Sequence, residues 1–84
     1  MGKFEDIVNI VSNSNETNNL PDNIKLNFYK FYKQATKGDC MIDKPSFYYF
    51  EAISKWNAWN SIKGMSKDEA KDNYINLYES IVKN

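Results

Sequence analysis

The sequence predicts an all-α fold, a compact four-helix bundle with one long connection, and three observations lead to this prediction. Apolar residues recur every three to four positions in four separate segments, which is the period of a helix with one buried face. Glycine, proline and asparagine fall between these segments, where helices end. The chain has 84 residues, enough for one modest core, so we expect residues 1–84 to form a single domain.

A first helix is expected from about Phe4 to Ser12. Its apolar residues follow the three-and-four spacing of one helix face: Phe4, Ile7, Val8 and Val11. The stretch that follows, "NSNETNNLPDN" from Asn13 to Asn23, is polar and rich in asparagine. Such a composition is typical of a loop, so we expect no helix here.

A second helix is expected to begin around Pro21 and to run to about Lys37. Proline is favoured in the first turn of a helix, where its missing amide proton costs nothing. Asp22 would lie near the positive end of the helix dipole. Gly38 then supplies the residue that adopts a left-handed conformation and ends the helix.

The third helix is predicted to cover "SFYYFEAISKWNAWNSIK", Ser46 to Lys63, with Gly64 as its stop. It follows the loop "GDCMIDKP", in which Pro45 limits any helix. Trp56 and Trp59 are large rings three positions apart, and we expect them to pack rather than to contact a ligand.

The fourth helix has a clear start. "SKDE", Ser66 to Glu69, matches a capping box, in which the serine hydroxyl accepts from a backbone amide and the glutamate reaches back. The inner face of this helix is then marked by Ala70, Tyr74, Leu77, Tyr78 and Ile81.

Two stripes of side chains run along the second helix. The first is apolar and suffices to bury the helix; it comprises Ile24, Phe28, Phe31 and Ala35. The second lies roughly 110° away at 100° of rotation per residue and comprises Leu26, Tyr29, Tyr32 and Lys33. Aromatic rings beside an ammonium suit a flat ring that carries an anionic group. The alternative is that these tyrosines only cover the edge of the core, and the stripe alone favours that interpretation.

Composition excludes several classes of protein. Eleven lysines balance eleven acids and there is no arginine, so the chain lacks the basic surplus of a nucleic-acid binder. Four lysines and no acid lie between Asp22 and Asp39, which leaves room for a local anion site. No apolar run is long enough for an integral membrane segment.

A few residues indicate where in the cell the protein acts and whether it is an enzyme. The first residues, "MGKFEDIVNI", do not resemble a secretory signal, and a single cysteine cannot form an internal disulfide. We therefore expect a cytoplasmic protein. Cys40 has no histidine to activate it, and neither a metal site nor paired carboxylates are evident, so we expect no enzyme activity, no metal and no cofactor.

The order and spacing of three longer segments resemble the acyl-CoA-binding protein family. The first runs from Tyr32 through "YKQAT" to Gly38 and Asp39. The second is "KWNAWNSIKG", and the third starts at Ser66 and includes Ala70, Tyr74 and Ile75. A run of this length with fixed spacings is far more specific than a short motif.

The resemblance implies a four-helix carrier of long-chain fatty acyl-CoA esters that does not change them chemically, and we expect a monomer. It implies contacts between the CoA head group and Tyr29, Tyr32, Lys33, Lys55 and Tyr74, with Tyr29 to Lys33 as the main binding run. Leu26 would line a groove for the acyl chain. The full predicted site is Leu26, Tyr29, Lys30, Phe31, Tyr32, Lys33, Lys55 and Tyr74.

Several interpretations stay open beside this one. Lys55 alone would be an ordinary exposed lysine, and Tyr74 lies on the inner stripe of its helix, so a core role competes with a ligand contact. The chain also has Ser12 or Asn13, and Glu51, in neighbourhoods where many family members are basic. The alternative function is a protein-interaction module that uses the aromatic stripe to hold a partner helix.

Overall fold

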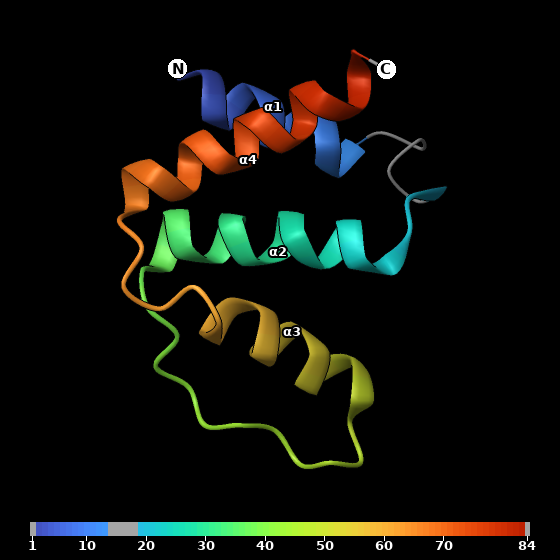
Figure 1. The fold of residues 1–84 in the computed structure, drawn as a ribbon, viewed down its shortest axis with the longest axis vertical. Helices are drawn as coiled ribbons and strands as arrows, with labels where there is room; N and C mark the ends of the chain where they lie inside the picture. The colour runs from blue at the N-terminus through green and yellow to red at the C-terminus, as the bar shows by residue number, and fades with distance from the viewer. Residues whose placement is uncertain (1, 14–18, 84) are drawn as a thin grey trace.

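Four α-helices account for the regular structure in the residues that the computed structural model describes, 2–13 and 19–83 (Figure 1). They are α1 (Lys3–Asn13), α2 (Asp22–Lys37), α3 (Phe50–Asn60) and α4 (Lys67–Val82). The predicted all-α class and the number and order of helices are confirmed within these residues.

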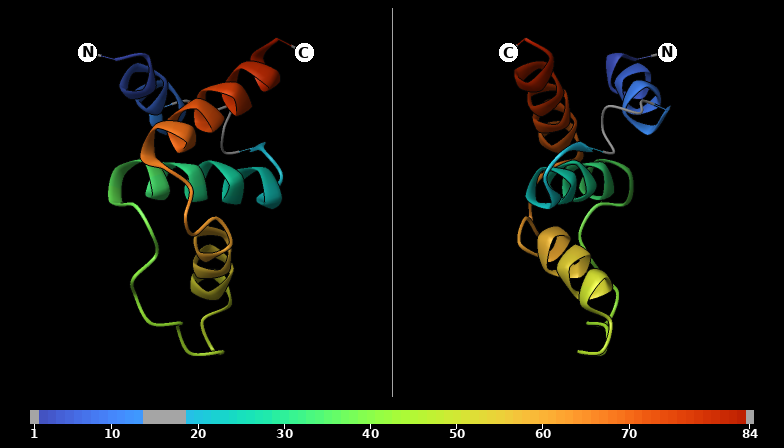
Figure 2. Two further views of the ribbon diagram at one scale, coloured as in Figure 1. Left: turned by 60° about the vertical axis from the view of Figure 1, so that its left-hand side comes forward. Right: turned by 90° about the vertical axis from the view of Figure 1, so that its right-hand side faces the viewer.

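The helix α2 lies at the centre of the arrangement. It packs against α4 on one side and against α3 on the other, while α1 packs against α4. Figure 2 shows the same order from two further directions: α1, α4 and both chain ends gather at one end of the molecule, and α3 lies at the other. Because α2 has neighbours on two sides, its two stripes of side chains face different environments.

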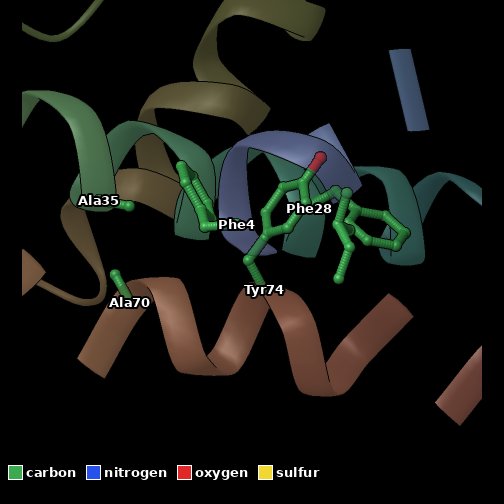
Figure 3. Packing of buried hydrophobic residues seen from close by; sticks show 6 residues of the cluster. Phe4, Phe28, Ala35, Ala70 and Tyr74 are labelled. Carbon is green, nitrogen blue, oxygen red and sulfur yellow. The ribbon is translucent and has the colours of Figure 1, made fainter. Parts of the chain in front are cut away.

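The core forms where α1, α2 and α4 meet (Figure 3). Tyr74 of α4 packs edge-on against Phe4 and Phe28, with ring centroids 5.3 and 5.1 Å away. Edge-to-face contacts are favoured because the positive rim of one ring meets the negative face of another. The inner-face role predicted for Tyr74 is confirmed.

The apolar stripe of α2 is confirmed as its packing face. Phe28 and Ala35 are buried, and Ile24 and Phe31 are partly buried against the same cluster. Outside this core, an ion pair between Lys3 Nζ and the Glu79 carboxylate, 2.8 Å apart, links α1 to α4. Water screens an exposed pair of this kind and its contribution is small, so aromatic packing dominates the stability of this end of the molecule.

The start of α4 agrees with the sequence. The Ser66 hydroxyl accepts a hydrogen bond from the Glu69 amide at 3.0 Å, which satisfies one of the free amides of the first turn. Asp68 and Glu69 lie in that turn, near the positive end of the helix dipole. The serine half of the predicted capping box is therefore confirmed.

Glycine ends α2 as predicted. Gly38 has φ 82° and ψ −150°, a conformation that residues with a side chain rarely adopt, and its amide donates to the Gln34 carbonyl at 3.1 Å. Gly64, with φ 97°, occupies the connection between α3 and α4. Both breakers in the sequence thus correspond to positions where only glycine is free of strain.

The predicted bounds of the third helix were wrong. The helix begins at Phe50 rather than Ser46, since the preceding residues form a turn in which the Tyr49 amide donates to the Ser46 carbonyl. The aromatic side chains of this turn are exposed, so no packing stabilises an extra helical turn there. At its other end α3 stops at Asn60. The chain then continues to Gly64 in tighter turns, in one of which the Lys63 amide donates to the Asn60 carbonyl at 3.2 Å.

The longest connection between helices joins α2 to α3, residues 38–49. Five residues of the predicted asparagine-rich loop, 14–18, lie outside the described residues. Pro21 immediately precedes α2 instead of lying in its first turn, and its carbonyl accepts from the amides of Ile24 and Lys25.

Candidate functional site

A groove of about 580 Å³ opens between α2 and the first turns of α3. Its walls combine apolar surface with charges of both signs. The lining residues are Asp22, Lys25, Leu26, Tyr29, Phe50, Glu51, Ser54 and Lys55. Three predicted site residues, Leu26, Tyr29 and Lys55, thus meet at one groove although they belong to two helices.

The ring of Tyr29 lies near two lysine ammoniums. The Nζ atom of Lys55 is 5.6 Å from the centre of the ring, and that of Lys33 is 5.9 Å from it. Lys33 also lies over the ring of Trp59, at 5.3 Å. These distances are within the range of cation–π attraction, which holds the ammoniums beside the rings without consuming their hydrogen-bond donors. The site therefore offers an aromatic face and two cationic donors in one place.

One of these lysines has a competing partner. Lys55 Nζ lies 3.3 Å from a carboxylate oxygen of Glu51, one helical turn earlier on α3. The Glu51 side chain is 86% exposed, so water screens the pair and its strength is small. An anion that reaches Lys55 would meet both the ammonium and this carboxylate.

Hydrogen bonds around the buried Gln34 side chain fix α3 relative to α2. Gln34 is fully buried, and its Nε2 donates to the Asp39 carboxylate and to the Met65 carbonyl, each at 2.8 Å. The amide of Gly64 donates to the same Asp39 oxygen at 2.8 Å. The Gly64 amide, and then Gln34, hold the pKa of Asp39 below its usual value because both bonds favour the carboxylate. These bonds tie the end of α2 to the turn after α3.

The two tryptophans add to this connection. Trp59 is buried and its Nε1 donates to the Gly38 carbonyl at 2.9 Å, so its predicted packing role is confirmed. Trp56 Nε1 donates to the Ile42 carbonyl at 2.8 Å. Both bonds run from α3 to the connection 38–49 and hold that connection against the helix.

Gln34 is the structural residue that the sequence interpretation missed. In the sequence it was considered only as part of the "YKQAT" segment that carries the family resemblance. Its position three residues after Phe31 puts it on the core face of the helix, which was an available signal. A polar side chain on a core face needs hydrogen-bond partners, and these come from Asp39 after the end of α2 and from Met65, which is distant in the sequence.

Tyr32 and Tyr74 lie close to each other and differ in exposure. Tyr74 is 3% exposed and Tyr32 is 40% exposed. Burial, and to a smaller extent the nearby Tyr32, raises the pKa of Tyr74 to about 12. The core role of Tyr74 is confirmed, and its contact with a ligand stays a prediction.

The remaining two predicted site residues are not among those that line the groove. Phe31 is partly buried against the core, which makes it a packing residue of α2. Lys30 lies with its Nζ 5.1 Å from the centre of the Phe31 ring. The structure thus groups Leu26, Tyr29, Lys33 and Lys55 and leaves Lys30 and Phe31 beside that group.

In 2–13 and 19–83, no helix combines the length and apolar character that crossing a membrane requires. The same residues contain no cluster of three or more histidine, cysteine or acidic side chains that would hold a metal ion. Cys40, in the connection after α2, is a free and buried thiol.

Comparison with known proteins identifies relatives of this chain. The family model described as "Acyl CoA binding protein" matches residues 1–78. The chain is 50% identical over 56 residues to an acyl-CoA-binding protein of Dictyostelium discoideum, an alignment that covers 67% of each protein. It is 43% identical over 72 residues to the acyl-CoA-binding domain-containing protein 6 homolog of the same organism, covering 86% of this chain. The chain spans only 25% of the length of that second relative.

The fold has a close counterpart among solved structures. The crystal structure of Oryza sativa acyl-CoA-binding protein 2 superimposes with a TM-score of 0.86 at 29% sequence identity. The match covers 95% of this chain and 87% of that one. Since the family model covers nearly all of the sequence and the four helices superimpose, the chain belongs to the acyl-CoA-binding protein family.

Proposed function

We propose that this protein binds long-chain fatty acyl-CoA esters non-covalently and carries them without chemical turnover. The observation that supports this most strongly is the position of Tyr29, whose ring lies near the ammoniums of Lys33 and Lys55 at the wall of an open groove. Acyl-CoA combines an aromatic base, phosphates and an apolar chain. Each of these has a complementary feature at this site.

The head group would occupy the tyrosine and lysine side of the site. An aromatic side chain can stack on any nucleotide base, because every base has a flat π face. Ammoniums bind phosphate as point charges. Lys33 and Lys55 would donate to the phosphates while Tyr29 contacts the adenine. Tyr32 is exposed enough to offer its hydroxyl, and Tyr74 would contribute its own from the edge of the core.

The acyl chain would use the apolar part of the groove, where Leu26 of α2 faces Phe50 of α3. Each buried methylene contributes about 0.8 kcal/mol before ordering costs, so partial burial of a long chain gives substantial affinity. The head group anchors the ligand, which makes entry of the chain effectively intramolecular.

We further propose that residues 1–84 act as a single domain, as a monomer, and in the cytoplasm, with acyl-CoA as ligand and with no catalysis of their own. The zero net charge and the absence of arginine from the sequence support a protein without nucleic-acid partners. The single cysteine supports a reducing compartment.

Titration calorimetry with three ligands tests this function. The expected order of affinity is acyl-CoA above free CoA, with free fatty acid far below both, and affinity should rise with chain length until the groove is full. A fatty acid that binds as tightly as its CoA ester would contradict the head-group site. If free CoA does not compete with acyl-CoA for the site, the result would instead favour a protein-interaction module.

The contribution of Tyr29 can be divided by two substitutions. Tyr29→Phe keeps the ring and removes the hydroxyl, so we expect it to weaken binding less than Tyr29→Ala. Equal losses in calorimetry would mean that only the hydroxyl contacts the ligand.

A further inference from the structure

The connection that leads into α3 exposes an unusual density of apolar side chains. Four consecutive aromatic residues are exposed by 70, 73, 64 and 79%: Phe47, Tyr48, Tyr49 and Phe50. At the start of the same segment Met41 is 82% exposed and Ile42 57%. We call residues 41–50 the aromatic loop. Single exposed apolar residues are ordinary, whereas a contiguous set marks an interaction surface.

The aromatic loop lies at an extremity of the molecule. Figures 1 and 2 both show it at the end of the structure opposite the chain termini, in green and yellow-green. Its start is anchored, since Cys40 is buried beside it and Trp56 donates to the Ile42 carbonyl, and its end is the first residue of α3. The rings of Phe47 and Tyr48 stack with centroids 4.3 Å apart. The loop therefore presents its aromatic side chains on an anchored segment that projects from the molecule.

The chemistry of these side chains favours a lipid partner. All four rings are exposed, and those of Phe47 and Tyr48 stack on each other to give one apolar surface. The headgroup region of a lipid bilayer surrounds an inserted loop on all sides. Tyrosine and phenylalanine suit this region because their rings are apolar and tyrosine adds a polar tip.

The charges of the loop indicate which membrane surface it would meet. Asp43 and Lys44 oppose each other in charge, and residues 45–50 carry none. An approach to anionic lipid would need a basic surplus, which this loop lacks. We propose that the aromatic loop inserts into the interface of a zwitterionic lipid bilayer. Because Phe50 also lines the groove, docking would place one end of the groove at the membrane surface.

This proposal does not depend on acyl-CoA binding and is tested without ligand. Wild-type protein should co-sediment with phosphatidylcholine vesicles equally at low and high salt, and brominated phosphatidylcholine should quench tryptophan fluorescence, because Trp56 contacts the loop. The double substitution Phe47→Ser with Tyr48→Ser should lower the partition coefficient by about tenfold or more, as expected for two aromatic rings withdrawn from an apolar phase.

A matched control lies at the opposite end of the molecule. Ile10 of α1 and Val82 of α4 are also exposed apolar side chains, at 49 and 53%. Ile10→Ser with Val82→Ser removes the same number of exposed apolar residues and should leave vesicle binding unchanged. Circular dichroism should show native helix content for both double variants, and their affinities for acyl-CoA in solution should equal that of the wild type.

Several results would overturn the proposal. Wild-type protein that stays in the supernatant, or an equal loss of binding in both double variants, would remove the loop as a membrane contact. A strict requirement for anionic lipid would contradict the neutral surface. A dimer that dissociates only in the loop variant, seen by analytical ultracentrifugation, would assign the loop to a second copy of the chain. Vesicle binding can fail while calorimetry still detects acyl-CoA, so the two proposals fail separately.

Discussion

The aromatic rings on the two sides of α2 lie in different environments. Toward α1 and α4, Phe28 and Tyr74 meet edge to face and are buried. Toward α3, Tyr29 lies beside lysine ammoniums at an open groove. Phe28 and Tyr29 are neighbours in the sequence, yet one lies in the core and the other lines the groove. The difference shows that a helix between two partners can separate stability from binding by about 100° of rotation.

The separation is incomplete at two points. Tyr74 belongs to the core by its burial and to the proposed head-group site by its hydroxyl. Gln34 belongs to the core, and its bonds also determine how α3, with Lys55, lies against α2. Substitutions on each side of α2, and at Tyr74, therefore test how far the two roles are independent.

The largest effect is expected on the core side. Phe28→Ala should lower the free energy of unfolding by about 3–5 kcal/mol, because it removes a buried ring and leaves a cavity beside Tyr74. Urea unfolding measured by circular dichroism checks this. A loss below about 1 kcal/mol would mean that the ring does not belong to the core.

Substitutions on the groove side of α2 should change the affinity for acyl-CoA and leave the stability of the fold nearly unchanged. Lys33→Ala should weaken acyl-CoA binding by about 1.5–3 kcal/mol, the range for losing a charge-assisted hydrogen bond, and should leave the unfolding midpoint nearly unchanged. Lys37→Ala is the matched control, since Lys37 is an exposed lysine one turn further along α2. Calorimetry in which both variants bind equally well would remove Lys33 from the site.

Tyr74 sharpens the comparison through its pKa. The raised pKa means that the folded protein keeps the Tyr74 proton after the unfolded chain has lost it at its ordinary pKa of 10.0. This contribution to stability is fully present below pH 10 and is lost as the pH rises to about 12. It amounts to about 2.7 kcal/mol, at 1.36 kcal/mol for each of the two tenfold changes in proton affinity.

Tyr74→Phe isolates this contribution, because the variant has no hydroxyl to titrate there. Urea unfolding at pH 8 and across pH 10–12 should show a steeper loss of stability for the wild type than for the variant. Parallel curves would contradict the burial of this hydroxyl. At neutral pH the variant also tests whether the hydroxyl reaches acyl-CoA, through its binding affinity.

The smallest effect is expected at the ion pair of the groove. Glu51→Gln frees Lys55 from its carboxylate partner, so acyl-CoA should bind up to about fivefold more tightly, in keeping with the strength of an exposed ion pair. The gain should shrink as salt is added. Glu69→Gln, an exposed acid on α4, should have no effect on affinity. Weaker binding by Glu51→Gln would mean that this carboxylate helps to hold the ligand.

Local signals predicted much of the fold. Periodicity found the buried stripe of α2, and the serine cap of α4 and the glycine after α2 were correct because each acts through a neighbour within a few residues. The start of α3 was wrong for the converse reason. The aromatic residues before Phe50 look helical in sequence, but whether they form a helix depends on packing that the fold does not provide.

The site was predicted less evenly. The structure brings Tyr29, Lys33 and Lys55 together, and only the family resemblance linked Lys55 on α3 to the stripe on α2; their contact with a ligand stays a prediction. Gln34 was missed because its partners, Asp39 and Met65, come together only in the folded chain. Phe31 was included with the run of binding residues, whereas its side chain packs against the core.

The most direct test of the claim that the groove side of α2 binds acyl-CoA is a titration followed by ¹H–¹⁵N NMR. Added acyl-CoA should shift the backbone amides of Tyr29, Lys33 and Lys55 most, while Glu79 and Lys83, at the far end of α4, stay near their free positions. Shifts that concentrate at the chain termini, or that leave Tyr29 and Lys55 unchanged at saturation, would contradict the account.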